Sequence, residues 1–144
     1  MKKYRFEMEG VLSYRTLIEQ HHQERVSTAR HELLVQEQRL QQLYDLKNAA
    51  APQDIDQANL FYLQHMDSYR LKMDELITNQ VEKVKWYENK VESCLDDLTA
   101  ATTERKVMEK LKDKSFNRFC QQLFGLEQKM LDEMGLFAFR GIAE

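Results

Sequence analysis

The side chains most able to do chemistry form three adjacent pairs: His21–His22, Asp96–Asp97 and Asp132–Glu133. Two histidines bind one zinc ion when they lie on the same helix face, and paired carboxylates can share acid–base work. Adjacent residues on a helix point about 100° apart, so none of these pairs can converge on one ligand. We therefore expect His22 at a helix interface and His21 in solvent, and no metal site.

Other catalytic patterns are absent from the sequence. It contains no glycine-rich phosphate loop, no GxSxG and no HExxH motif. Cys94 and Cys120 form no CxxC pattern, so we expect two reduced, partly buried thiols of a cytoplasmic protein. The sequence predicts a protein that is not an enzyme and that binds no cofactor.

The composition predicts long helices as the elements that carry these residues. Of 144 residues, 31% are charged and 42% are hydrophobic, with mean hydropathy −0.68. Gly is absent between Gly10 and Gly125, and Pro52 is the only proline. A sheet needs frequent turns, whereas helices that each bury one narrow stripe suit this composition.

Charge and hydropathy exclude two classes of partner. The 21 basic and 24 acidic side chains are mixed along the chain and give a net charge of −3, which disfavours nucleic-acid binding. No run approaches the ~20 apolar residues of a membrane span. The basic start, Met1–Phe6, has no apolar run behind it, so we expect neither a secretory signal nor insertion into a membrane.

The break around Pro52 predicts a single domain, 1–144, built as a long antiparallel two-helix coiled-coil hairpin. We expect a first helix at about 4–50, a tip at about 51–54, a second helix at about 55–134 and a frayed tail at 135–144. Proline removes a backbone donor and disfavours helix at the preceding residue. At 1.5 Å per residue the arms are roughly 70 Å and 120 Å long, so the second extends past the first.

Apolar residues spaced alternately by three and four positions predict which side chains of each helix face the other helix. We call this line of facing positions the seam. In the first helix the predicted seam is Met8, Val11, Arg15, Ile18, His22, Val26, Ala29, Leu33, Gln36, Leu40 and Leu43. Two steps of four, at Ile18, His22 and Val26, predict a stutter.

In the second helix the predicted seam is Tyr62, Met66, Tyr69, Met73, Ile77, Gln80, Val84, Tyr87, Val91, Cys94, Leu98 and Ala101, then, after a phase slip, Met108, Leu111, Phe116, Phe119, Leu123, Leu126 and Met130. Polar seam positions predict marginal stability and a need for a partner. Apolar residues that cannot all face one helix, such as Phe61–Leu63 and Phe116, Phe119 and Phe124, indicate binding surfaces.

Three segments of the chain stand out by their order and spacing. Near the start, Phe6 is followed by Val11–Leu12 and Arg15; later come Met108–Lys114, which contains Glu-Lys-Leu, and Leu131–Met134, which contains Leu-Asp-Glu. These segments, together with the chain length and the position of the break, resemble the FliJ family of flagellar export proteins.

The resemblance implies a component of the flagellar type III export apparatus, cytoplasmic and peripherally associated with the inner membrane. It implies an antiparallel coiled coil similar to the stalk of rotary ATPases, with the end carrying both termini in the pore of the hexameric export ATPase. It also implies contact with the cytoplasmic domain of the export gate and with export chaperones. A stalk of a virulence secretion system and an unrelated coiled-coil adaptor or chaperone are the alternatives.

Carried over by position, the resemblance implies two sets of contact residues. The export-gate set is Gln36, Leu40, Leu43, Tyr62, Met66, Tyr69 and Met73. The ATPase set is Phe6, Arg15, Lys110, Lys112, Phe116, Arg118, Phe119 and Asp132. In each set the alternative is an ordinary role, as hairpin core or as a solvated charged face.

Overall fold

Two long helices make up the fold in this computed structural model, which describes residues 3–50 and 60–142. Helix α1 spans Glu9–Ala49 and helix α2 spans Leu60–Ile142. The two helices pack against each other, and the described residues contain no strand. The expected all-α helical hairpin is confirmed, whereas the predicted tip at 51–54 lies outside the described residues.

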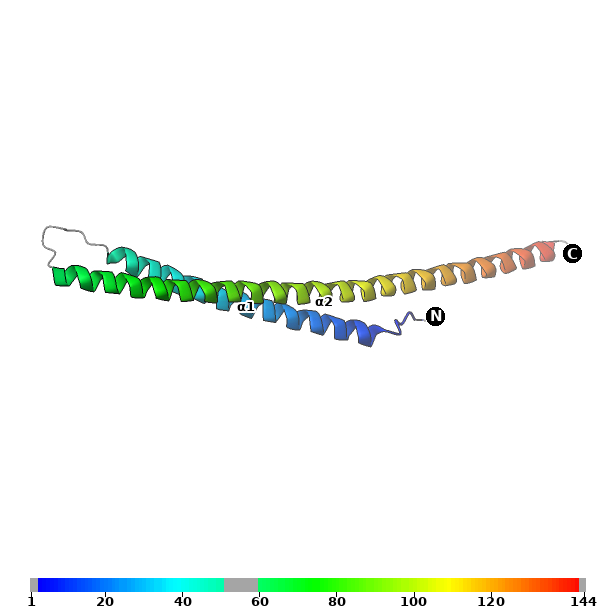
Figure 1. Cartoon of the computed structure of the whole chain (residues 1–144). Helices are drawn as coiled ribbons and strands as arrows, with labels where there is room; N and C mark the ends of the chain where they lie inside the picture. Colours follow the sequence, from blue (N-terminus) through cyan, green and yellow to red (C-terminus); the bar gives the residue numbers. More distant parts are fainter. Residues whose placement is uncertain (1–2, 51–59, 143–144) are drawn as a thin grey trace. The chain divides into compact units, whose positions relative to one another are not determined.

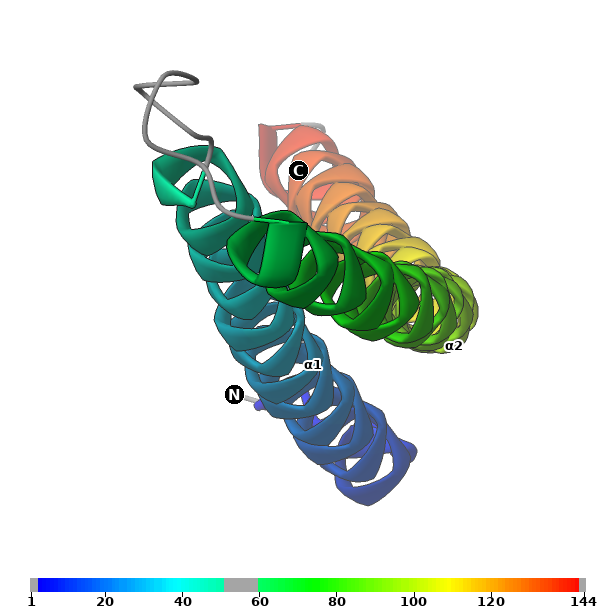
Figure 2. The ribbon, with the colours of Figure 1, turned by 60° about the vertical axis from the view of Figure 1, so that its left-hand side comes forward.

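The structure divides into two compact units. Unit 1 contains the described parts of Met1–Glu19 and Ala101–Glu144, and unit 2 is Gln20–Ala100. In unit 2, Glu32 contacts Lys90 whereas the later Lys47 contacts the earlier Asp74. Partner numbers fall in α2 as they rise in α1, so the helices are antiparallel; Figures 1 and 2 show them side by side in this unit.

The helix ends differ from those predicted. Helix α1 begins at Glu9 rather than near Tyr4, after a turn in which the Glu9 amide donates to the Phe6 carbonyl at 3.3 Å. Glu9 in the first turn and Lys47 in the last turn both interact favourably with the helix dipole. Helix α2 does not end near Met134 but continues to Ile142.

Gly135 and Gly141 therefore do not end α2. Neither glycine adopts positive φ, and each is a helical residue with open space beside it. A helical glycine costs roughly 1 kcal/mol relative to alanine, and the Leu, Met, Glu and Lys residues around these two favour helix. The sequence prediction placed a frayed tail at 135–144, whereas the structure continues the helix through both glycines.

The core of unit 2 follows the predicted seam. Val26 and Ala29 of α1 pack with Val91 and Cys94 of α2, and Leu33, Leu95 and Leu98 complete the cluster. Met73, Ile77 and Val84 are also buried. Fully burying one aliphatic side chain contributes about 1.5–3 kcal/mol, and a two-helix seam offers few such positions.

A buried amide pair interrupts this apolar seam. Gln80 is 6% exposed, and its Nε2 donates to Gln36 Oε1 at 2.9 Å and to the Gln36 carbonyl at 3.0 Å. Both residues occupy predicted seam positions, and each provides a hydrogen-bond partner for the other's side chain. Polar seam residues of this kind fix the register at some cost in stability.

The predicted stutter in α1 is wrong. The buried and half-buried positions of helix α1 include an unbroken alternation of three and four residues: Leu12, Arg15, Glu19, His22, Val26, Ala29, Leu33, Gln36, Leu40 and Leu43. Thr16, Ile18, Glu32 and Lys47, beside or beyond this series, are half-buried as well. Glu19, which is 8% exposed, takes the seam position that apolar spacing assigned to Ile18. Met8 and Val11, predicted in the seam, are 50% and 44% exposed.

The predicted phase slip in α2 is also wrong, because a charged residue occupies the seam there. After Ala101 the less exposed positions continue through Arg105, Met108, Lys112, Ser115 and Phe119. Arg105 forms an ion pair with Glu19, so a charged pair keeps both helices in register. Of the other predicted seam residues of this stretch, Leu123 is half-buried, whereas Leu111, Phe116, Leu126 and Met130 are exposed.

Candidate partner-binding surfaces

All seven residues of the expected gate-binding set lie in unit 2, three on α1 and four on α2. Leu40 and Leu43 of α1 are half-buried, as is Met66 of α2, while Tyr62 and Tyr69 are exposed. Met73 is 6% exposed, and the side chain of Gln36 accepts a hydrogen bond from Gln80. Because Met73 is buried, it belongs to the hairpin core. The members of this set that a partner could contact are therefore the tyrosines and the leucines.

A surface cleft of about 550 Å³ lies beside these residues. It is lined by Leu43, Leu76, Asn79, Gln80, Glu82, Lys83 and Trp86. Trp86 is 60% exposed and Leu76 is 45% exposed. The sequence analysis missed both, although each is a large apolar residue placed outside the seam spacing, which is the signal used for Phe61–Leu63.

Trp86 is held in place by its neighbours on α2. Its ring meets Tyr87 edge to face, with centroids 4.9 Å apart, and Lys90 Nζ lies 5.7 Å from the Trp86 centroid. Lys90 also donates to Glu32 of α1 at 2.7 Å, and this hydrogen bond raises the pKa of Lys90 above its ordinary 10.5. An exposed, oriented tryptophan is typical of the centre of a protein interface.

The ATPase set lies in unit 1, where a non-helical N-terminal strap, Lys3–Met8, runs along α2. Tyr4 packs edge to face on Phe116, with centroids 5.1 Å apart, and lies 5.4 Å from the Phe119 centroid. The Tyr4 hydroxyl donates to the Lys112 carbonyl at 3.2 Å. Phe6 is 8% exposed, so its side chain is packed inside the fold while the strap lies against α2.

Ion pairs hold the helical part of unit 1 together. Arg15 pairs with Glu104, and Lys112 Nζ lies 2.9 Å from Glu9 Oε2. Two members of the ATPase set, Arg15 and Lys112, are thus engaged within the fold. Lys110 and Arg118 are exposed, as is Asp132 farther along α2.

The last part of α2 is apolar and lacks cover from α1. Its exposed side chains include Phe124, Leu126, Met130, Leu131, Met134, Leu136, Phe137, Phe139 and Ile142, each at least 56% exposed. Leu126, Met130, Met134 and Phe137 recur at steps of four, four and three, which places them on one face. Exposed apolar surface of this kind is typical of protein-binding sites.

No chemistry of metals or nucleophiles emerges from residues 3–50 and 60–142. These residues include no group of three His, Cys, Asp or Glu side chains able to hold a metal ion. His21 is exposed and His22 half-buried, as predicted. Both cysteines are free; Cys94 is buried, but Cys120 is exposed, so the expectation that it is partly buried is wrong. No described helix is long and apolar enough to cross a membrane.

The described residues thus form an all-α helical hairpin that exposes aromatic and apolar side chains on both helices. Residues 4–143 match the family described as Flagellar FliJ protein, and the chain belongs to this family. Its members are non-enzymatic components associated with flagellar protein export. Comparison with curated proteins and with solved structures gives no match.

Proposed function

We propose that this protein is a central stalk of the flagellar export ATPase, which unit 1 binds while unit 2 binds the cytoplasmic domain of the export gate. The observation that carries the proposal is the uncovered apolar stretch of α2 from Phe124 to Ile142 in a member of this family. A helix that extends past its partner helix is free to enter a ring of subunits. The protein then works at the inner membrane without crossing it.

The gate side of the proposal is supported by the cleft in unit 2. Leu43 belongs to the expected gate set and lines this cleft together with the exposed Leu76 and Trp86. Tyrosine and tryptophan contribute large contact areas at low entropic cost and dominate many interfaces. Export chaperones are further partners in this proposal, and the exposed Tyr14 and Leu17 of α1 offer them apolar contacts.

A crossed pair of variants tests both halves. Phe116→Ser with Phe119→Ser is expected to abolish stimulation of the export ATPase and to leave binding to the gate domain unchanged. Leu76→Ser with Trp86→Ser is expected to weaken gate binding about tenfold or more, the loss typical of interface hot spots, and to leave ATPase stimulation unchanged. Circular dichroism confirms that each variant remains helical.

The two assays separate the two assignments. If the full chain neither binds the ATPase nor changes its turnover, the stalk role is wrong. If the Phe116 and Phe119 changes spare stimulation, the contact has been assigned to the wrong surface. A pull-down with export chaperones, using Tyr14→Ser with Leu17→Ser as the variant, tests the third contact in the same way.

A further inference from the structure

Four basic side chains surround the contact between the N-terminal strap and α2. Lys3 and Arg5 belong to the strap, and Lys114 and Arg118 belong to α2. All four are exposed. Among the described residues, none of the four takes part in an ion pair. Their charges are therefore available to a partner.

Two shallow clefts connect these cations. One, of about 420 Å³, is lined by Lys3, Tyr4, Arg5, Ser115, Arg118, Phe119 and Gln122. The other, of about 280 Å³, is lined by Arg5, Phe6, Glu7, Met8, Leu111, Lys114, Ser115 and Arg118. Arg5, Ser115 and Arg118 line both clefts, and Glu7 is the one carboxylate among the lining residues.

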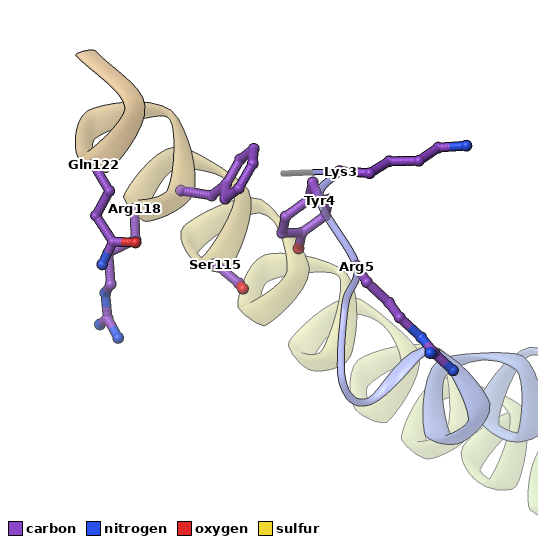
Figure 3. A pocket seen from close by; sticks show the side chains of 7 residues that line it. Lys3, Tyr4, Arg5, Ser115, Arg118 and Gln122 are labelled. Carbon is purple, nitrogen blue, oxygen red and sulfur yellow. The ribbon is translucent and has the colours of Figure 1, made fainter. Parts of the chain in front are cut away.

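The directions of the side chains decide what kind of anion fits. Figure 3 shows Lys3, Arg5 and Arg118 pointing away from one another around the contact between Tyr4 and Phe119. Cations that diverge cannot surround one phosphate or one carboxylate. They can each meet a different negative charge along an extended ligand, with Ser115 and Gln122 as neutral hydrogen-bonding groups between them.

The surface depends on how the strap is held. The ring contacts of Tyr4 with Phe116 and Phe119, and its hydroxyl bond to the Lys112 carbonyl, bring the strap against α2. Lys3 and Arg5 flank Tyr4 in the sequence, so these contacts also fix where two of the four charges lie. Detaching the strap would leave only Lys114 and Arg118 in place.

We propose that the strap and α2 together form a binding surface for an acidic, extended protein segment. The proposal deepens the proposed function, on which it rests, by naming clustered Asp and Glu side chains as the partner chemistry that unit 1 recognises. Complementary charge raises association rates and selects the partner, and its effect falls as salt is added.

The observations favour an acidic protein over a nucleic acid. A phosphate backbone carries closely spaced charges and needs a continuous basic track. Here Glu7 lines one of the clefts, and Glu9 of the same unit already neutralises Lys112. A protein segment can place its carboxylates opposite the four free cations and avoid both glutamates.

Fluorescence anisotropy with a labelled poly-glutamate peptide tests the proposal on the full chain. We expect saturable binding that weakens steeply with salt. Lys3→Glu with Arg5→Glu is expected to weaken binding about fivefold, because two exposed charge contacts are lost together. The matched control, Arg70→Glu with Lys72→Glu in unit 2, changes net charge equally at exposed positions and should leave binding unchanged.

A second pair of variants isolates the strap. Tyr4→Ala keeps all four cations but removes the ring contacts, so binding should fall, whereas Tyr4→Phe, which keeps the ring, should bind nearly normally. Equal loss in the two charge-reversed variants would overturn the proposal. So would full binding by Tyr4→Ala, or tighter binding to a DNA oligonucleotide or to anionic lipid vesicles than to poly-glutamate. ATPase stimulation by the wild-type chain, measured separately, tests the proposed function: a chain that binds poly-glutamate but leaves the ATPase unchanged would contradict the stalk role and leave this surface standing.

Discussion

Glu19 of α1 and Arg105 of α2 form an ion pair at the helix interface, with 11% and 21% of their side-chain surfaces exposed. Thr102 Oγ1 also donates to Glu19 at 3.2 Å, and Arg105 Nη1 lies 2.6 Å from Glu109 Oε1. Hydrogen bonds to Glu19 and then Glu109 raise the pKa of Arg105 above its ordinary value. Arg105 therefore stays charged at every physiological pH.

This pair favours an antiparallel arrangement of helices. In a parallel pairing of two copies of α1, Glu19 would face a second Glu19 without compensation, and such an unpaired buried charge is strongly destabilising. The antiparallel arrangement instead places Arg105 opposite Glu19. A single polar seam position can select register and partner in this way, at a cost in stability.

Gln36 and Gln80 should form a second polar seam pair that selects the register and the partner helix. Replacing both by leucine is expected to raise the free energy of unfolding by about 2 kcal/mol, because apolar surface replaces the amides. The same change should promote self-association, since an apolar seam no longer discriminates between partners. Thermal unfolding and light scattering measure the two effects. Gln38→Leu with Gln64→Leu, at exposed positions, is the control and should not stabilise the fold; no change in either measurement for the seam pair would contradict the assignment.

The Lys90–Glu32 pair predicts a loss of stability at high pH. Its hydrogen bond raises the pKa of Lys90 above 10.5 in the folded protein, so the pair contributes fully below about pH 10.5 and is lost as pH rises through the raised pKa. Glu32→Gln removes the charged partner. We expect its melting temperature to lie below that of the wild type at neutral pH, and this difference in melting temperature to narrow as the pH rises past about 10.5 and through the raised pKa of Lys90. A gap independent of pH would rule out this explanation.

The two thiols should react at very different rates. Cys120 is exposed, whereas Cys94 is 6% exposed and packs against Val26, Ala29 and Val91. A thiol reagent such as Ellman's is expected to modify one cysteine rapidly in the native protein and both in denaturant. Cys120→Ser should remove the rapid phase. Rapid modification of both cysteines in the folded wild type would show that the unit 2 core is open.

The apolar parts of the fold were predictable from spacing alone. Val26, Ala29, Val91 and Cys94 lie in the seam as predicted, since unit 2 has aliphatic or small residues at nearly every third or fourth position. Even Gln80 was placed correctly because apolar neighbours on both sides fixed the register. The helix pairing followed from the break near Pro52.

The errors arose where charged residues occupy the seam. Spacing rules choose the nearest apolar residue, so Ile18 was preferred to Glu19, and Arg105 was passed over. Only the partner across the interface reveals that each charge is compensated. The N-terminal strap was missed for a similar reason, because Tyr4 and Phe6 also fit a helical pattern and only their contacts with α2 show the chain extended there.

A charge-swap cycle at Glu19 and Arg105 tests the register of the hairpin most directly. Glu19→Arg and Arg105→Glu are each expected to lower the melting temperature by roughly 5–10 °C, and the double swap to restore it to within about 3 °C of the wild type. These values should not depend on protein concentration if both partners belong to one chain. Small, additive effects of the two single changes would contradict the account, as would a melting temperature that rises with concentration.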